Sequence, residues 1–471
     1  MVTIEPTIEQ ADLESLSDHS LQLNKWLLKP IGAWPRSSTC TKMETISSLI
    51  MISVCYFCIV ITVVPSIVYM ILDDDVIDRK LKVVGPLSHW FIGGLNYTTL
   101  LMRSKEIQFC MDQMKKDWRA VSKLKDLQMM IKDAQFGRYV VVFCAAFMQV
   151  GVLCFCVVKA FTEEIIHVGN ETRTSHMLPC PAYKKLILAY TSPINEIFFV
   201  VQFFSGFVAN STAAGAFSFA AVFAVHAYGQ LNLLMMWIQE LVNRSEKYNK
   251  RVDLNEIGVI VENHLRILNF ISHIENVMNM ICFMELFKCT VCICMLEYHI
   301  LMDWAARDFQ AVMSYIVILC SMSFNIFIMC YIGERLSDQC NKVGEAVYMT
   351  NWYYLHNRDI LNLIMIISRA NVVTKITAGK ILHMSFNTFA GMMKTAFAYL
   401  NVLRQTVGEM SYMTDWYRLS DKKMLCCILI IAMSNSSIKL TAGNMIELSI
   451  STFSDVVRTA VAFLNMLRAL T

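Results

Sequence analysis

Cysteine is the residue whose number and spacing first suggest chemistry in this sequence. The chain has 17 cysteines, three of which, Cys289, Cys292 and Cys294, stand close together in the segment CTVCIC. Closely spaced thiolates can bind zinc, but this segment lacks the accompanying cluster of His or carboxylate ligands. Most of the cysteines lie in apolar runs, where a thiol acts as a small hydrophobic side chain. We therefore predict no metal site, and Cys180, the one cysteine in a candidate outer loop, supports no disulfide within the chain.

Residues that could carry out catalysis are no better organised. The sequence contains no glycine-rich phosphate-binding loop and no ordering of Ser, His and Asp typical of a hydrolase. We expect no catalytic residues, no cofactor and no enzymatic activity. The net charge of +3 is close to neutral, and we expect no nucleic-acid partner.

A polar stripe late in the chain suggests ion conduction instead. Thr388, Thr395 and Val402 are seven residues apart, so they lie on one side of a helix, and Gln405 and Thr406 follow near its end. Polar side chains inside a membrane usually face protein or water. The stripe therefore either lines a water-filled pore that ends in an apolar constriction or packs against another helix through its small residues.

The elements that would position this stripe are membrane-spanning helices. Hydrophobic residues make up 56% of the chain and charged residues 17%, whereas about one quarter of a typical soluble domain is charged. Runs of about twenty mainly apolar residues, the length that crosses a bilayer as a helix, begin near Thr45, Val83, Tyr139, Glu196, Phe270, Ala311 and Thr374. We predict an all-α membrane protein with a seven-transmembrane helical bundle.

Charges in the connecting loops predict the orientation of this bundle. Cytoplasmic loops carry an excess of Lys and Arg, and the second loop, residues 103–138, is strongly basic, whereas the first contains the acidic segment DDDVID. The third loop contains the sequon Asn170-Glu171-Thr172, so we predict glycosylation at Asn170. We therefore expect an intracellular amino terminus. A receptor that signals through G proteins also has seven spans, but in the opposite orientation, and it stays an alternative.

The carboxy-terminal part of the sequence is a tandem repeat of two similar segments. Residues 343–406 and 407–470 align without a gap, so that VGEAVYMTNWYYL recurs as VGEMSYMTDWYRL and KITAGK as KLTAGN. We divide the chain into a seven-transmembrane unit, 1–406, and a second copy of the terminal segment, 407–471. Both copies begin with basic residues that favour the cytosolic side, so only one can take that orientation freely. The second copy is then a joined alternative segment, a helix pair that crosses back, or a peripheral helix.

Six segments, in this order and spacing, resemble insect odorant receptors of the ligand-tuned type. They are KPIGAWP, NEIFFVVQF, HAYGQL, ENHLRILNFISHIENV, YIGERLSDQ…GEAVY and KITAGK…TFAGMMKTAFAYLNVLRQT, within residues 22–406. The resemblance implies an odorant-gated, non-selective cation channel, assembled as a heterotetramer with a co-receptor subunit in the plasma membrane of olfactory sensory neurons. It implies that the seventh helix lines the pore, with Val402 as the gate and Gln405 and Thr406 setting ion preference. A receptor made non-functional by its fused duplicate segment stays an alternative.

The same resemblance implies a pocket for a small volatile ligand in the outer half of the bundle. Its expected lining residues are Trp90, Phe91, Cys154, Phe155, Phe203 and Tyr315. Pockets for small molecules are mainly apolar and aromatic, and no charged residue stands out in these outer halves, so we expect a neutral odorant rather than an amine or a carboxylate. Packing within the bundle or contact with membrane lipid is the alternative role for any one of these aromatic residues.

One polar pair lies at the predicted inner end of the fourth span. His226 and Gln230 are one helical turn apart. We expect them to form hydrogen bonds between helices rather than a proton relay.

Overall fold

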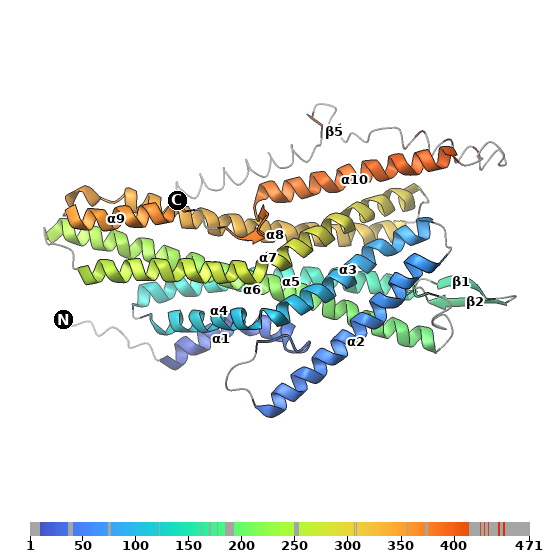
Figure 1. The fold of residues 1–471 in the computed structure, drawn as a ribbon, viewed down its shortest axis with the longest axis horizontal. Coiled ribbons are helices and arrows are strands. Elements are labelled where there is room, and N and C mark those ends of the chain that lie inside the picture. Colours follow the sequence, from blue (N-terminus) through green and yellow to red (C-terminus); the bar gives the residue numbers. More distant parts are fainter. Residues whose placement is uncertain are drawn as a thin grey trace.

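Helices make up most of the described chain, as the long apolar runs predict (Figure 1). The computed structural model describes residues 10–35, 41–73, 77–121, 123–161, 163–168, 171–176, 178–183, 193–248, 254–305, 307, 309–355, 357–372 and 375–413, with positions 424, 428, 432, 441–442 and 446–447. The helices are α1 (Gln10–Leu28), α2 (Lys42–Leu72), α3 (Ile77–Met102), α4 (Ser104–Arg119), α5 (Leu124–Phe161), α6 (Ile194–Tyr248), α7 (Leu254–Ala305), α8 (Phe309–Tyr348), the short 3₁₀ helix η1 (Trp352–Tyr354), α9 (Asn357–Ala370) and α10 (Phe386–Met413). The prediction of an all-α membrane protein is confirmed.

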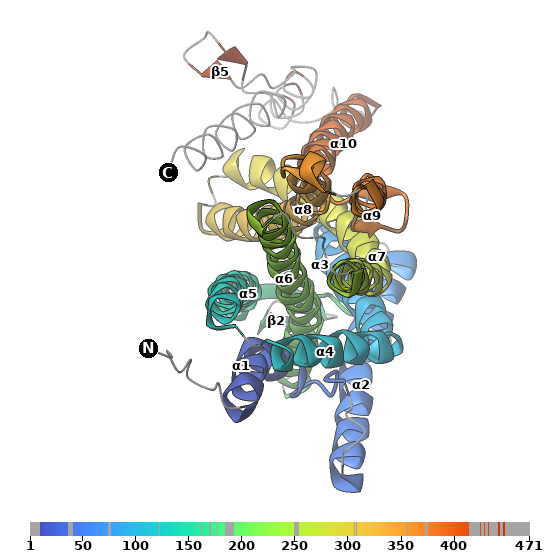
Figure 2. The ribbon, with the colours of Figure 1, turned by 90° about the vertical axis from the view of Figure 1, so that its left-hand side faces the viewer.

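Helix α6 forms the centre of the bundle. Figure 2 shows it surrounded by other helices, and α1, α2, α3, α5, α7 and α8 all contact it. Its middle third is rich in Ala and Gly, and small side chains let neighbouring backbones approach closely. One close approach is to α3, where a Cβ added to Gly93 would lie 2.5 Å from the Cβ of Ala209. The small residues of α6 therefore decide how tightly the bundle closes around it.

Length and composition allow five of the described helices to cross a membrane, namely α2, α5, α6, α7 and α8. Helix α2 has a well-defined start, because Thr41 and Glu44 form a capping box that satisfies free backbone N–H groups. Helices α3 and α10 pack along the same bundle; α3 contacts α2, α6 and α7, and α10 contacts α7 and α8. Figures 1 and 2 place α2 and α10 on opposite sides of α6, at the periphery.

The two ends of the bundle differ in construction. At one end, α4 and α9 extend the bundle beside the long ends of α6 and α7 (Figure 1). At the other end, strands β1 (Glu163–Val168) and β2 (Glu171–His176) form an antiparallel hairpin between α5 and α6. The third loop, predicted to be outside, contains the hairpin, whereas α4, in the basic second loop predicted to be inside, lies toward the opposite end of the bundle.

The start of the last helix differs from the prediction. The apolar run begins near Thr374, but the segment that follows forms strands β3 (Thr377–Ala378) and β4 (Leu382–His383), and α10 begins at Phe386. The helix cannot start earlier because Gly379 and Lys380 have positive φ angles of 63° and 59°, the left-handed conformation of a tight hairpin turn. Ser385 then caps α10 by accepting the N–H of Thr388, and Glu334 accepts the N–H of Phe386.

The second copy contains the same small hairpin. Strands β5 (Thr441–Ala442) and β6 (Ile446–Glu447) pair in the same register as β3 and β4, and they occupy the equivalent positions of the repeat. Helix α10 runs without a break across the proposed boundary at residue 406. Most other residues of 407–471 lie outside the described residues.

Candidate functional site

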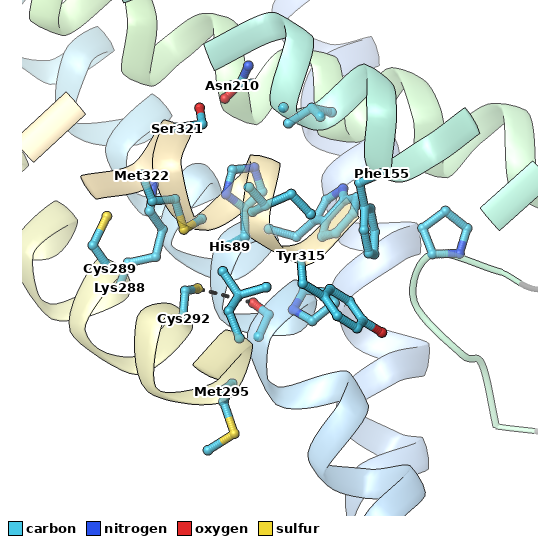
Figure 3. Close-up of a pocket in the computed structure, with 18 of the residues that line it drawn as sticks. His89, Phe155, Asn210, Lys288, Cys289, Cys292, Met295, Tyr315, Ser321 and Met322 are labelled. Carbon is cyan, nitrogen blue, oxygen red and sulfur yellow. Dashed lines mark hydrogen bonds between the residues drawn. The ribbon is translucent and has the colours of Figure 1, made fainter. Parts of the chain in front are cut away.

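A cavity of about 370 Å³ lies inside the bundle, toward the hairpin end. Its walls come mainly from α3, α5, α7 and α8, and side chains from these four helices converge on it in Figure 3. Helix α6 contributes Asn210 and Phe217, and the segment Leu178–Pro181 covers one side. The size is suited to a small organic molecule.

Three of the six predicted ligand residues line this cavity. Trp90 of α3, Phe155 of α5 and Tyr315 of α8 are among its walls. They come from three separate helices, so the tertiary fold brings together aromatic residues that are far apart in the sequence.

The other three predicted residues are not among the lining residues. Phe91 points away, with 47% of its surface exposed, because it is the helix neighbour of the buried Trp90. Cys154 is half-buried beside Phe155, and Phe203 packs edge-on against Phe204 at a ring distance of 6.0 Å. Adjacent residues of a helix face directions about 100° apart, so Phe91 and Cys154 point to a different side of their helices than Trp90 and Phe155 do.

The prediction that no charged residue stands out near the pocket is wrong. Glu285 and Lys288 of α7 both line the cavity, and each is only 3% exposed. Their side chains form an ion pair at 2.5 Å, and the amide of Asn96 donates to the other carboxylate oxygen at 2.6 Å. The sequence did hold a signal, since two ionisable residues three apart in an apolar run are unusual in a membrane span. The prediction missed it because every expected ligand residue lies on α3, α5, α6 or α8, and none lies on α7.

One side chain holds the segment Leu178–Pro181, the cover of the cavity, in place through hydrogen bonds. Gln202 of α6 accepts the backbone N–H of Cys180 at 3.0 Å and donates to its carbonyl at 2.7 Å. Leu178, Pro179 and Pro181, on either side of Cys180, line the cavity. Cys180 is fully buried with a free thiol.

Lysines mark the outer side of the cavity. Lys159 lies over the ring of Phe155, 5.8 Å from its centre, and Lys82 lies 3.8 Å from Asp303. Both lysines line the cavity. Their charged groups can remain hydrated while their aliphatic stems cover apolar surface.

A second polar cluster lies at the far end of the bundle, between α4, α6 and α7. Asp117 is 6% exposed and lies 3.0 Å from His226, and Arg266 approaches its other oxygen at 3.2 Å. Gln230, one turn from His226, donates to the sulfur of Met130 at 3.6 Å. The expected hydrogen bonds between helices are therefore present, each to a different helix.

The predicted pore residues lie on α10. Met392, Ala396 and Leu400 are its buried side, whereas Thr395 is exposed and donates to the carbonyl of Gly391 at 2.8 Å. Val402, Gln405 and Thr406 belong to the same helix, but their side chains lie outside the described residues. Asn170 also lies outside them, between β1 and β2.

Within the described part of the chain, no group of three or more His, Cys, Asp or Glu residues could hold a metal ion. Cys289 and Cys292 line the cavity instead, and the thiol of Cys292 lies 3.2 Å from the hydroxyl of Ser88.

Comparison with known proteins identifies relatives of this architecture. A family model described as "7tm Odorant receptor" matches residues 79–397. Odorant receptor 10 of Aedes albopictus is 24% identical over 217 residues, covering 46% of this chain and 57% of the relative. Odorant receptor 2a of Drosophila melanogaster is 23% identical over 195 residues, covering 40% of this chain and 49% of the relative. These matches thus span about half the length of each relative.

Solved structures show the same fold. The insect olfactory receptor OR5 from Machilis hrabei superposes with a TM-score of 0.71 at 16% identity, over 83% of this chain and 99% of that one. The same receptor in complex with eugenol superposes with a TM-score of 0.66 at 14% identity, over 84% of this chain and all of that one.

Proposed function

This chain belongs to the seven-transmembrane odorant receptor family, and from that premise we propose that it is the ligand-tuned subunit of an odorant-gated cation channel. It is a multi-pass membrane protein of a receptor family rather than an enzyme family. The observation that carries the proposal is the cavity lined by Trp90, Phe155 and Tyr315. A structurally similar receptor is described in complex with eugenol, a small organic molecule, which supports a ligand of that size here.

The proposed assembly is a heterotetramer with a co-receptor subunit in the plasma membrane of olfactory sensory neurons. Support comes from α10, which lies at the periphery of the bundle and exposes Thr395, Phe397 and Tyr399. An exposed face on a peripheral helix is suited to contact with another subunit or to lining a shared pore. In this arrangement Val402 forms the apolar gate, and Gln405 and Thr406 set ion preference.

Current recording tests the proposal directly. Cells that express the full chain with a co-receptor should conduct cations when a panel of neutral volatiles is applied, and the current should persist when G-protein signalling is blocked. Current that disappears with the block would support the G-protein alternative instead.

Two phenylalanines, one in the cavity wall and one outside it, provide a matched pair of variants. Phe155→Ala removes part of the cavity wall and should raise the odorant concentration needed for half-maximal current at least about tenfold, because burial of an aromatic ring contributes over 1 kcal/mol. Phe91→Ala changes an outward-facing ring and should alter the response little. If the two variants had equal effects, the cavity would not be the site at which the odorant binds.

The pore assignment has its own test. Val402→Ala should raise the current without odorant by widening the apolar constriction, and Gln405→Ala should change the relative permeability of potassium and sodium. Unchanged basal current and permeability in both variants would place the pore elsewhere.

We assign residues 1–406 to the receptor unit and 407–471 to a joined alternative of its last segment. A whole olfactory receptor superposes on 83% of this chain, which supports a single receptor unit plus additional residues. A chain ending at Met413, which keeps α10 whole, should then conduct like the full chain. Loss of current on this truncation would show that the second copy is needed.

Glycosylation tests the orientation. Asn170→Gln should abolish a mobility shift on glycosidase treatment if the β1–β2 end faces outward. Asn435, in a second-copy sequon, serves as the reporter for that copy: glycan there would place it outside the cell.

A further inference from the structure

The wall of the cavity contains an ion pair that bundle stability does not require. Glu285 and Lys288 are each 3% exposed and lie within α7, and a membrane interior is a costly environment for a charge. Replacing a buried ion pair by apolar residues is often neutral or stabilising. Packing therefore gives no reason for these two charges at the cavity wall, whereas recognition of a ligand does.

The ammonium group of Lys288 has unused hydrogen-bonding capacity. It carries three N–H donors, and among the described residues its hydrogen-bond partner is Glu285. The carboxylate is engaged on both oxygens, by Lys288 and by Asn96. The pair thus presents donors to the cavity, rather than acceptors.

Two further polar groups on the cavity wall lack partners. Asn325 of α8 is 6% exposed, and its side-chain oxygen has no hydrogen-bond partner in the described part of the chain. The same is true of both ring nitrogens of His89. An imidazole carries at least one N–H whether it is neutral or protonated, and its χ2 angle turns readily. A buried polar group without a partner is costly, so these atoms are positioned to gain from a ligand.

Lys288 and Asn325 lie deeper in the bundle than Phe155 and Tyr315. Asn325 is ten residues further along α8 than Tyr315, which corresponds to about 15 Å along a helix. Phe155 lies near the end of α5 at Phe161, whereas Lys288 lies well inside α7, which ends at Ala305. The cavity therefore has the polar groups of Lys288 and Asn325 toward its inner end and the aromatic rings of Phe155 and Tyr315 toward its outer end, where Lys82 and Lys159 also lie.

We propose that the inner end of the cavity is a hydrogen-bonding subsite for a neutral carbonyl or hydroxyl oxygen of the ligand, which accepts from Lys288 and from an N–H of His89. A hydroxyl ligand also donates to the side-chain oxygen of Asn325. The hydrocarbon part of the ligand occupies the aromatic outer end. The ion pair is neutral as a whole, so a carboxylate or an ammonium ligand would leave an uncompensated charge in a poorly hydrated site. This inference rests on the proposed odorant function and specifies the ligand class.

A binding series of equal carbon number tests the subsite without relying on channel opening. Octane, 1-octanol, 2-octanone, octanoate and octylammonium are titrated into the purified full chain, and dissociation constants are measured by thermal stabilisation. The quantity compared is the affinity of 2-octanone relative to octane, which cancels the shared hydrocarbon contribution. Binding of none of the five would contradict the odorant cavity itself, and with it the subsite.

The double variant Glu285→Gln/Lys288→Met removes both charges and keeps an amide oxygen for Asn96. It should reduce the preference for 2-octanone over octane about tenfold, as expected for loss of a hydrogen bond to a charged donor. Asn325→Leu, which leaves the ion pair intact, should reduce the preference for 1-octanol several-fold. Phe287→Leu, one residue before Lys288 and 59% exposed, is the matched control and should change neither ratio. Unchanged ratios in both test variants, with octane and 2-octanone still binding, would overturn the polar subsite while leaving the odorant cavity intact.

Discussion

Two buried polar clusters, at opposite ends of the bundle, use similar residues for different purposes. One carboxylate oxygen of Asp117 accepts a hydrogen bond from the side-chain amide of Gln113 at 3.0 Å and lies 3.2 Å from the guanidinium of Arg266. The other oxygen lies 3.0 Å from the ring of His226. The cluster around Glu285 and Lys288 instead borders the cavity of about 370 Å³, with Asn325 and His89 lacking partners in the described part of the chain. The void beside His226 is only about 20 Å³.

The difference shows how burial and hydrogen bonding separate structural from binding groups. A charge whose oxygens are all engaged by its own chain fixes the positions of the helices it joins, here α4, α6 and α7. A charge with unused donors beside an open space can still bind something else. We therefore expect the first cluster to affect stability and the second to affect ligand binding.

The largest effect should come from breaking the Asp117 cluster. Asp117→Ala leaves His226 and Arg266 without their carboxylate, and we expect a loss of about 3 kcal/mol in the free energy of unfolding, at the lower end for a broken buried pair because Arg266 is 37% exposed. The double variant Glu285→Gln/Lys288→Met should change it by less than about 1 kcal/mol, because no unpaired charge remains. Thermal unfolding of the purified full chain measures both. The reverse order would show that the cavity cluster is the structural one.

A smaller loss should follow from crowding the contact between α3 and α6. Gly93→Ala places a Cβ 2.5 Å from that of Ala209, so the helices must separate, and we expect a cost of about 2 kcal/mol. The shift would also move Trp90 and weaken ligand binding. Gly258→Ala is the control: its added Cβ meets nothing within 4 Å, and the change should stabilise α7 by up to about 1 kcal/mol. A similar melting temperature for the two variants would contradict close packing at Gly93.

The cover of the cavity should contribute less, and mainly to kinetics. Gln202→Leu removes both hydrogen bonds that hold Cys180, and a loss of about 1 kcal/mol should speed ligand dissociation about fivefold. Washout kinetics of the odorant-evoked current measure this rate. A dissociation rate equal to that of the unchanged chain would mean that the Leu178–Pro181 segment does not limit ligand exit.

The smallest effect is expected at the outer side of the cavity. Lys159→Met removes the cation over Phe155 but keeps an apolar side chain, so affinity should change by only about 0.5 kcal/mol, roughly twofold. Its effect on ligand affinity is compared with that of the variant at the polar inner end. A loss larger than that of the Glu285→Gln/Lys288→Met variant would reverse their assigned roles.

Much of the fold could be predicted because the signals are local. The long apolar runs identify helices that cross a membrane, and KITAGK contains the turn residues of the β3–β4 hairpin, although the start of α10 was misplaced. Hairpin turns depend on a few local residues, and the similar segment KLTAGN of the second copy leads into the same strand pairing, β5 with β6. Phe91 could not be placed from local signals. The rotation of α3 about its axis decides which of the adjacent residues Trp90 and Phe91 faces inward, and the neighbouring helices set that rotation.

The amino-acid sequence by itself determined the membrane class, the helical bundle, the family resemblance and the repeated terminal segment, because composition, span length and segment order are properties of the chain alone. Only the tertiary structure decided that Trp90, Phe155 and Tyr315 share one cavity with Glu285, Lys288 and Asn325. These residues come from α3, α5, α7 and α8, and the rotation of each helix about its axis is set by packing around the small residues of α6. For the same reason, only the packed helices decide whether the groups of a buried ion cluster are all hydrogen-bonded within the chain or border an empty cavity.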